Sequence, residues 1–365
     1  MNRQTAGLVL RRMAIKTASL LPLGWRDYSR LIVVGDRGGW VLDEEMANLR
    51  KVCRHIGIRT VVGDWERVAR RQCVFHANRY ALLNLPETPK HRICFPYYHG
   101  KPGTGSSEFD GMFKHVVDYK DRWTRIQVSH TEMQEILLST GIAPERVRRI
   151  PIAIRIELFD LATEETQTRV RNRLGISANA FVVGSFQKDG NGWGEGLEPK
   201  LIKGPDVLVE TLRALKGRIP ELFVLLCGPA RGYVKRRLAE AGIPFRHVYA
   251  QTYREIPAMY HALDVCLVTS RQEGGPKAVL ESMASGVPLA TTRVGQAMDL
   301  VKNGENGFMV DVEDVDGLAH SVERVRGLDD VTRSALLQAG RATAEANAWS
   351  RQGPLWQDFF AGVVE

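Results

Sequence analysis

Short apolar runs alternate with longer amphipathic stretches along most of the chain, and glycines separate many of them. In the first half, each run is rich in Val, Ile, Leu and Phe, as in a buried strand, and the stretches between the runs have helical spacing. Strands that alternate with helices are typical of an α/β domain with a mostly parallel sheet. The pattern predicts strands at 30–34, 59–62, 73–75, 92–98, 125–128 and 149–152.

The second half repeats this scheme after a join near residues 159–165, where a charged helix over 165–174 begins. Because strands and helices alternate again, we expect a second doubly wound domain. Open α/β sheets bind ligands beyond the carboxyl ends of their strands, so candidate chemistry belongs to the loops that follow strands. The predicted strands are 181–185, 223–226, 247–250, 265–268, 288–291 and 307–310, and the predicted helices begin at Pro205, Arg231, Ile256, Pro276 and Val315.

Length and composition agree with two domains. A chain of 365 residues exceeds what one core usually serves, and 44% apolar and 25% charged residues exclude collagen and wholesale disorder. The five cysteines are odd in number and form no C-x-x-C pair, which indicates reduced thiols and a cytoplasmic chain. No apolar stretch reaches the roughly 18 residues that a membrane span needs.

Positive charge is concentrated at the amino end. Residues 1–30 hold six basic side chains against Asp27 alone, so +5 of the net charge of +8 lies there. Residues 1–26 form a basic extension with two interpretations, an amphipathic membrane-surface helix or a frayed tail. The charge favours an anionic partner, but the chain has no motif that reads nucleic acid. A nicotinamide enzyme is also disfavoured, because none of the predicted strands is followed by a G-x-G-x-x-G motif.

The segment 264–281 carries the most informative motif of the chain. An apolar strand leads into a loop that holds Glu273, Gly274 and Gly275, and a proline stands where a helix would begin. The N–H groups at such a helix start form an anion site, and the glycines let a ligand approach the backbone closely. Glu281 follows eight residues after Glu273, about two turns into the helix.

These glutamates stand in the motif EGGPKAVLE, which is followed by SMASGVPLATTRVG and later by NGENGFMV. Together the motifs resemble those of the retaining glycosyltransferases of family four, which have the GT-B fold. The resemblance implies two Rossmann-like doubly wound domains that face a central cleft, and a C-terminal helix that crosses back to the first domain. It gives an acceptor-side domain of residues 27–160 with 347–365, and a donor-binding domain of residues 161–346.

The resemblance also implies roles for the residues of this motif. Glu273 would contact the hydroxyls of the donor sugar and act in catalysis, and Glu281 would bind the nucleotide ribose. The backbone between them would border the diphosphate, with phosphate contacts from two N–H groups at the helix start. The residues implied to lie along the diphosphate are Gly274, Gly275, Lys277 and Ala278.

A second group of candidates lies in the loop 187–203, between a predicted strand and a predicted helix. In the family a basic pair at this loop neutralises the leaving diphosphate, and the resemblance implies that Lys203, which precedes Gly204, is catalytic in this way. The other basic residue usually follows the strand's glycine, but Ser185 stands there, and Lys188 is the substitute. The four alternating glycines of the loop fit either a flexible surface excursion or a lid over the donor.

Three further sites follow predicted strands, and the resemblance implies a role for each. His99 lies at the sheet's carboxyl edge and would approach the reacting sugar as a catalytic residue. Gly228 and Pro229 resemble the turn that borders the base and the diphosphate. Gly38 and Gly39 resemble the glycine loop that approaches the diphosphate and the acceptor.

The resemblance therefore implies a retaining, metal-independent hexosyltransferase. It would move a sugar from a UDP- or GDP-linked donor to a glycan or lipid-linked glycan acceptor in cell-envelope polysaccharide assembly. We expect no cofactor, and no metal, because lysines and backbone amides would neutralise the diphosphate in this scheme. The acidic run 311–316 could suggest a D-x-D metal site, but it follows a predicted strand and is typical of the capped start of a helix. The expected location is the cytoplasm, with peripheral contact to the inner membrane face through residues 1–26. The alternatives are a nucleotide-sugar-binding protein without turnover and a GT-B epimerase.

Overall fold

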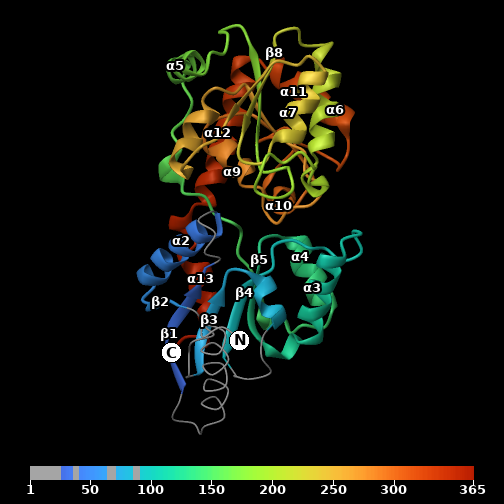
Figure 1. The fold of residues 1–365 in the computed structure, drawn as a ribbon. Helices are drawn as coiled ribbons and strands as arrows, with labels where there is room; N and C mark the ends of the chain where they lie inside the picture. Colours follow the sequence, from blue (N-terminus) through green and yellow to red (C-terminus); the bar gives the residue numbers. More distant parts are fainter. Residues whose placement is uncertain (1–25, 36–40, 64–70, 85–90) are drawn as a thin grey trace, which may run out of the picture. The chain divides into compact units, whose positions relative to one another are not determined.

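The computed structural model describes residues 26–35, 41–63, 71–84 and 91–365 of the chain (Figure 1). The described residues form two compact units. The first unit ends at Pro151 and includes Trp349–Glu365, and the second unit is Ile152–Ala348. The boundary lies earlier than the predicted residue 160, because Ile154 and Phe159 pack into the core of the second unit.

The first unit is built on a six-stranded parallel sheet with the order β2-β1-β3-β4-β5-β6. Its strands read as apolar runs because parallel strands are covered on both faces, and Cys73, Val74 and Phe75 are at most 2% exposed. The order is the flavodoxin-like variant of a doubly wound sheet. The strands are β1 (Arg26–Val34), β2 (Thr60–Val62), β3 (Arg71–His76), β4 (Arg92–Pro96), β5 (Trp123–Val128) and β6 (Val147–Arg149). The α-helices are α2 (Val41–His55), α3 (Ser107–Asp118), α4 (Thr131–Ser139) and α13 (Gly353–Phe360).

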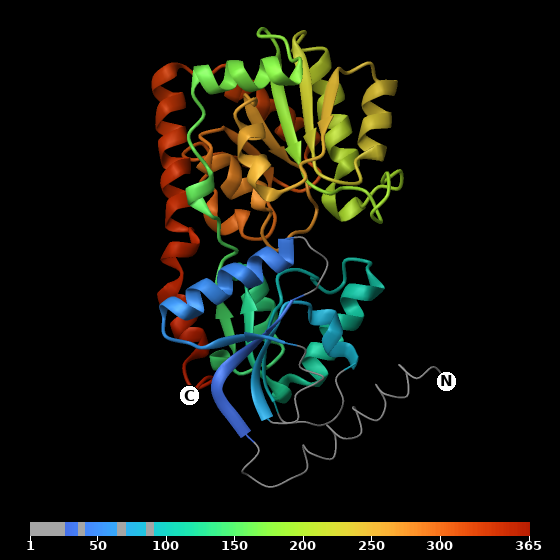
Figure 2. The same cartoon turned by 60° about the vertical axis from the view of Figure 1, so that its left-hand side comes forward.

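The C-terminal helix α13 belongs to the first unit and packs against α2 (Figure 2). The ring of Phe75 in β3 lies edge-on to Trp356 and Phe359, with ring centroids 5.7 and 6.1 Å apart. The carbonyl oxygen of Val363 accepts a hydrogen bond from Arg92 Nη1 at 2.7 Å. The prediction that the last helix returns to the first domain is therefore confirmed.

The second unit contains a six-stranded parallel sheet with the order β12-β11-β10-β7-β8-β9. This is the Rossmann order, because the chain runs outward from β7 to β9 and then returns to the other side of β7. The reversal lies between β7 and β10, and open α/β sheets bind ligands at the carboxyl side of such a point. The strands are β7 (Phe181–Phe186), β8 (Leu222–Cys227), β9 (Phe245–Val248), β10 (Val265–Val268), β11 (Leu289–Thr292) and β12 (Phe308–Val310).

Helices cover both faces of this second sheet (Figure 1). One core contains apolar side chains of α5, α8, α9 and α12, and the other contains those of α6, α7 and α11. The α-helices are α5 (Glu164–Leu174), α6 (Pro205–Lys216), α7 (Gly232–Glu240), α8 (Ile256–Tyr260), α9 (Lys277–Ala284), α10 (Ala297–Leu300), α11 (Val315–Arg326) and α12 (Asp330–Ala346). Short 3₁₀ helices are η3 (Arg79–Asn84), η4 (Lys120–Arg122), η5 (Pro144–Arg146), η6 (Ile156–Leu158), η7 (Leu201–Lys203), η8 (Tyr253–Glu255) and η9 (Trp349–Arg351). The two predicted doubly wound α/β domains are confirmed.

All five cysteines lie in the described part of the chain and are buried free thiols, as predicted. Burial raises the pKa of Cys53 and of Cys266 to about 12, which makes both thiols poor nucleophiles. Within the described ranges, no helix is long and apolar enough to cross a membrane. Apart from Arg26, which begins β1, the predicted basic extension 1–26 lies outside the described residues.

Candidate functional site

The structure brings together two of the predicted catalytic residues, Glu273 and Lys203. Lys203 Nζ lies 2.6 Å from Glu273 Oε1, and Ser270 Oγ donates a hydrogen bond to the same oxygen at 2.9 Å. Glu273 belongs to the turn after β10, and Lys203 ends η7, so the pair joins the two sides of the chain reversal at β7 and β10. The Glu273 side chain is 9% exposed and that of Lys203 23%, so the pair is only partly open to solvent.

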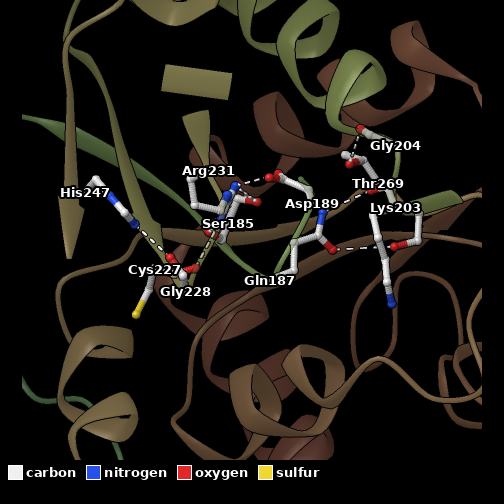
Figure 3. Close-up of polar contacts among 11 residues, drawn as sticks. Ser185, Gln187, Asp189, Lys203, Gly204, Cys227, Gly228, Arg231, His247 and Thr269 are labelled. Carbon is white, nitrogen blue, oxygen red and sulfur yellow. Dashed lines mark hydrogen bonds and ion pairs between the residues drawn. The ribbon is translucent and has the colours of Figure 1, made fainter. Parts of the chain in front are cut away.

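A close packing contact fixes the backbone that carries Lys203. The next residue, Gly204, has a left-handed φ of 60°. A Cβ at this position would lie 1.9 Å from the carbonyl oxygen of Thr269, so a side chain does not fit there. Thr269 Oγ1 donates to the Gly204 carbonyl at 2.9 Å, and Gln187 Nε2 donates to the Lys203 carbonyl at 3.0 Å (Figure 3). Residues that follow β7 and β10 therefore set the position of Lys203.

Replacing Gly204 by alanine is expected to destabilise the chain. A Cβ in the left-handed region costs about 1–2 kcal/mol, and relieving the contact with Thr269 adds to this. We expect the free energy of unfolding to fall by about 2 kcal/mol or more in urea denaturation. The matched control is Gly217→Ala, because Gly217 has a φ of −76° and its Cβ would meet open space. Equal stability of the two variants would contradict the packing argument.

The second predicted glutamate, Glu281, lies in α9 and is buried. Tyr253 donates its hydroxyl to Glu281 Oε1 at 2.7 Å, and Tyr260 donates to Oε2 at 2.9 Å. Burial, together with the charge of Glu281, raises the pKa of Tyr260 well above its usual value, so this hydroxyl stays protonated as a donor. Lys277 Nζ lies 5.1 Å from the centroid of the Tyr253 ring, which places Lys277 beside these groups. The predicted ribose contact of Glu281 stays a prediction.

Helix α9 begins directly after the predicted glycine turn. Its N-cap is Pro276, whose side chain has no hydrogen-bond acceptor. The N-cap side chain therefore does not cap the first N–H groups of α9, which begin at Lys277 and Ala278. Packing inside the protein also requires a glycine at position 275, and the predicted approach of a ligand there stays a prediction. A Cβ at Gly275 would lie 2.6 Å from Gln296 Oε1, so a protein side chain fills this space.

Gln296 holds the turn of Gly274 and Gly275 in place. Its backbone N–H donates to the Gly274 carbonyl at 3.0 Å. Its side chain accepts from the N–H of Ile152 at 2.8 Å and donates to the Ile152 carbonyl at 3.0 Å. These contacts anchor the backbone before α9 to the first residue of the second unit, Ile152.

The loop 187–203, called here the glycine-rich segment, is folded rather than a free surface excursion. The N–H of Lys200 donates to the Asp189 carbonyl at 2.8 Å, and Gly190 and Pro199 form an antiparallel bridge. Cβ atoms at Gly190 or Gly196 would each lie 2.3 Å from a backbone oxygen, whereas those at Gly192 and Gly194 would meet open space. Within the segment, the stretch 190–196 therefore packs closely where it starts and ends and is open between these points. The interpretation as a lid stays a prediction.

The predicted second cation, Lys188, lies against an aromatic ring. Lys188 Nζ is 3.7 Å from the centroid of the Trp193 ring, and Trp193 is 61% exposed. Partial burial lowers the pKa of Lys188 below its usual value. The contacts of Lys188 do not include the Lys203–Glu273 pair within the described residues, so its role at the diphosphate stays a prediction.

The turn after β8 contains the predicted residues Gly228 and Pro229. Gly228 has a φ of 109°, and a Cβ there would lie 2.9 Å from the Gln187 carbonyl oxygen, so the turn packs against the start of the glycine-rich segment. The ring nitrogen Nε2 of His247 lies 2.8 Å from the Gly228 carbonyl oxygen (Figure 3). The nucleotide contacts of this turn stay a prediction.

The first unit contains the remaining predicted residues. His99 follows β4, and its ring lies edge-on to that of Phe109 with centroids 5.4 Å apart. Gly100 beside it has a φ of 101°, which accounts for a glycine at this turn. The role of His99 at the sugar stays a prediction, and Gly38 and Gly39 lie outside the described residues.

Asp314 in the acidic run 311–316 caps α11, as the sequence indicates, and two other residues of the run pair with arginines. Asp314 is the N-cap and accepts the N–H of Gly317 at 2.8 Å. Asp311 pairs with Arg293 at 2.9 Å, and Glu313 pairs with Arg271 at 2.5 Å. Among the residues that the structure describes, no three His, Cys, Asp or Glu side chains gather as metal ligands.

Several polar partners in this region are absent from the sequence prediction. Arg231 and Asp189 form a buried ion pair beside Ser185, and the sequence offers no local signal for it, because an arginine at a helix start is usually exposed. Ser185, which stands where the resemblance expects a basic residue, is thus contacted by the guanidinium of Arg231, which follows β8. The other missed residues are Gln187, Tyr260, Thr269, Ser270 and Gln296.

Comparisons with known proteins place the chain in a family. The model of the family described as "Glycosyl transferases group 1" matches residues 197–341. The chain is 32% identical over 307 residues to the "Lipopolysaccharide core biosynthesis mannosyltransferase LpsB" of Rhizobium meliloti (strain 1021), covering 80% of this chain and 79% of that protein. It is 27% identical over 229 residues to the "D-inositol 3-phosphate glycosyltransferase" of Corynebacterium glutamicum (strain R), covering 60% of this chain and 52% of that protein. The chain thus spans about half the length of several relatives of this second kind.

Solved structures of low sequence identity have the same fold. Anabaena Alr3699/HepE in complex with UDP-glucose has a TM-score of 0.73 with 17% identity, over 91% of this chain and 99% of that chain. Sucrose-phosphate synthase from Thermosynechococcus elongatus has a TM-score of 0.70 with 17% identity, over 91% of this chain and all of that chain. From the family match, the LpsB relative and this fold, we conclude that the chain belongs to the group 1 glycosyltransferases and has the GT-B fold.

Proposed function

We propose that the chain transfers a hexose from a nucleotide-diphosphate sugar to an acceptor hydroxyl, with retention at the anomeric carbon and without a metal or cofactor. The contact between Lys203 and Glu273 carries the proposal. In such a donor the anomeric carbon is bonded to a phosphate oxygen, so sugar hydroxyls and phosphate oxygens lie side by side. A carboxylate and an ammonium group 2.6 Å apart can therefore meet both parts of one donor.

The main chemical task in this reaction is to stabilise the charge on the departing diphosphate. Lys203 is held by the backbone contacts of Gly204, so its charge needs little reorganisation during the reaction. The N–H groups of Lys277 and Ala278 at the start of α9 add the positive end of a helix dipole. We assign Lys188, in the glycine-rich segment, as the second cation, and Glu273 as the group that orients the sugar.

The donor and the acceptor are proposed as chemical classes. The UDP-glucose complex of Anabaena Alr3699/HepE and the mannosyltransferase of lipopolysaccharide core biosynthesis from Rhizobium meliloti support a UDP- or GDP-linked hexose as donor. The acceptor is proposed to be a glycan or lipid-linked glycan of the cell envelope. Glu281 is assigned to the ribose, and His99 to the reacting sugar.

A donor assay tests this function. We expect UDP-glucose or GDP-mannose to release its nucleoside diphosphate in the presence of the chain, and the rate to be unchanged when EDTA is added. The anomeric configuration of the product, read by NMR coupling constants, should equal that of the donor. Inversion would contradict the proposed chemistry, and loss of activity in EDTA would contradict the proposed metal independence. Donor binding without release would favour a binding protein without turnover.

Location at the inner face of the membrane, through residues 1–26, is proposed from their positive charge. Liposome sedimentation with anionic and neutral lipids tests it, using the chain with and without residues 1–25, so that β1 is kept. We expect only the longer chain to sediment with anionic liposomes. Equal sedimentation of both would contradict this role.

A further inference from the structure

Arg231 joins the carboxyl ends of two neighbouring strands in the second unit. It lies between β8 and α7 and is 1% exposed. Its Nη1 donates to the carbonyl oxygens of Ser185 and Cys227 at 2.5 and 3.0 Å, and its Nη2 donates to Ser185 Oγ at 3.1 Å. Figure 3 shows the guanidinium group with these residues and Asp189 around it. One side chain therefore fixes the ends of β7 and β8 relative to each other.

The same guanidinium also holds the glycine-rich segment. Arg231 Nη2 lies 3.0 Å from Asp189 Oδ2, and both side chains are 0% exposed. Burial raises the pKa of the Asp189 carboxyl, and the positive charge of Arg231 opposes this rise. The neighbouring residue in the segment is Lys188, the proposed second cation.

The segment is also tied to the start of α7, which follows Arg231. The N–H groups of Gly232 and Tyr233 donate to the carbonyls of Glu195 and Gly196 at 2.7 and 2.8 Å. The end of the segment carries Lys203, whose carbonyl accepts from Gln187. The segment that Arg231 and Asp189 hold therefore carries both proposed cations: Lys188 precedes Asp189 directly, and Lys203 ends the segment.

The ion pair offers more than stability. A buried pair of charges stabilises a fold little more than a well-packed apolar pair would, because both groups lose their hydration. Unlike an apolar side chain, a guanidinium has planar N–H donors in fixed directions, so its acceptors must lie at certain positions. The three hydrogen bonds of Arg231 fix its guanidinium at the ends of β7 and β8. The ion pair with this fixed group then sets where Asp189, and with it the start of the segment, lies.

We propose that Arg231, acting through Asp189, is a positioning residue for the donor site, which holds the glycine-rich segment so that Lys188 and Lys203 face the diphosphate. The role at the diphosphate rests on the proposed function. The claim that the pair holds the segment does not, because it concerns the backbone of residues 187–203 alone.

The test compares Asp189→Asn with a matched variant, Asp264→Asn. Asp264 forms a similar ion pair with Arg171 at 2.7 Å and accepts the N–H of Val182, at the opposite end of the same sheet. The measurements are amide hydrogen exchange along the chain, thermal unfolding, and kcat and KM for the donor. We expect Asp189→Asn to speed exchange in residues 187–203 and to raise the donor KM about tenfold, since misplaced groups weaken binding. Asp264→Asn should change neither the exchange of residues 187–203 nor the donor KM, when the two variants are compared at the same folded fraction.

A second variant covers a failure of Asp189→Asn to fold. Arg231→Met with Asp189→Leu removes both charges together, so no buried charge is left unpaired. It also removes the hydrogen bonds to the Ser185 and Cys227 carbonyls, so we expect lower stability but a folded chain with fast exchange in residues 187–203. Unchanged exchange in either folded variant, or equal losses in Asp189→Asn and Asp264→Asn, would overturn the proposal. If the wild-type chain turns over neither donor, the proposed function fails, and the exchange of residues 187–203 alone then decides whether the pair holds the segment.

Discussion

Replacing Glu273 by alanine is expected to lower kcat for sugar transfer roughly 10²- to 10³-fold, because the donor sugar loses the group that orients it. The affinity for UDP or GDP should stay the same or rise, since neither nucleotide carries the sugar and Lys203 loses its anionic partner. Steady-state kinetics and calorimetric titration with the nucleoside diphosphate measure the two effects separately.

The control for this variant is Glu313→Ala, a glutamate of the same unit that pairs with Arg271 and has a 60% exposed side chain. It should transfer sugar at the wild-type rate. Loss of both transfer and nucleotide binding in Glu273→Ala would show that Glu273 is structural. Glu273→Gln separates charge from shape, since an amide oxygen can still accept from Ser270.

Replacing Lys203 by alanine is expected to lower kcat/KM roughly 10²- to 10³-fold, because a preorganised charge at the leaving group is lost. Unlike Glu273→Ala, this change should also weaken the binding of the nucleoside diphosphate, since Lys203 is assigned to the phosphates. The placement of the loop should be kept, because the backbone contacts through Gly204 remain.

Lys302→Ala is the matched control, because Lys302 is 71% exposed and pairs with Glu305, three residues later in the same turn. Its removal should leave nucleotide affinity unchanged. An unchanged affinity in Lys203→Ala as well would remove Lys203 from the diphosphate. Lys203→Arg should recover only part of the activity, because a guanidinium differs from an ammonium group in size and hydrogen-bond geometry.

The sequence predicted those features that local patterns encode. Apolar runs between helical stretches located the strands, because parallel strands buried on both faces contain few polar residues. The E-x7-E spacing placed Glu273 before α9 and Glu281 within it, as the structure shows. Lys203 was identified through the glycine that follows it, and Gly204 indeed occupies a conformation that a side chain cannot enter.

The sequence did not predict contacts that join distant strand ends. Arg231 and Asp189 are 42 positions apart in the sequence, and neither stands in a motif. The sequence also did not predict that the side chain of Gln296 fills the space beside Gly275. Local patterns also could not place the domain boundary, because the packing of Ile154 and Phe159 in the second core depends on helices far along the chain.

The most direct test of the central claim is a crystal structure of the chain with an unreactive analogue of its donor. We expect Lys203 Nζ about 3 Å from a diphosphate oxygen and the Glu273 carboxylate at a similar distance from a sugar hydroxyl. A donor bound elsewhere, with the Lys203–Glu273 pair still closed at 2.6 Å and touching neither phosphate nor sugar, would contradict it.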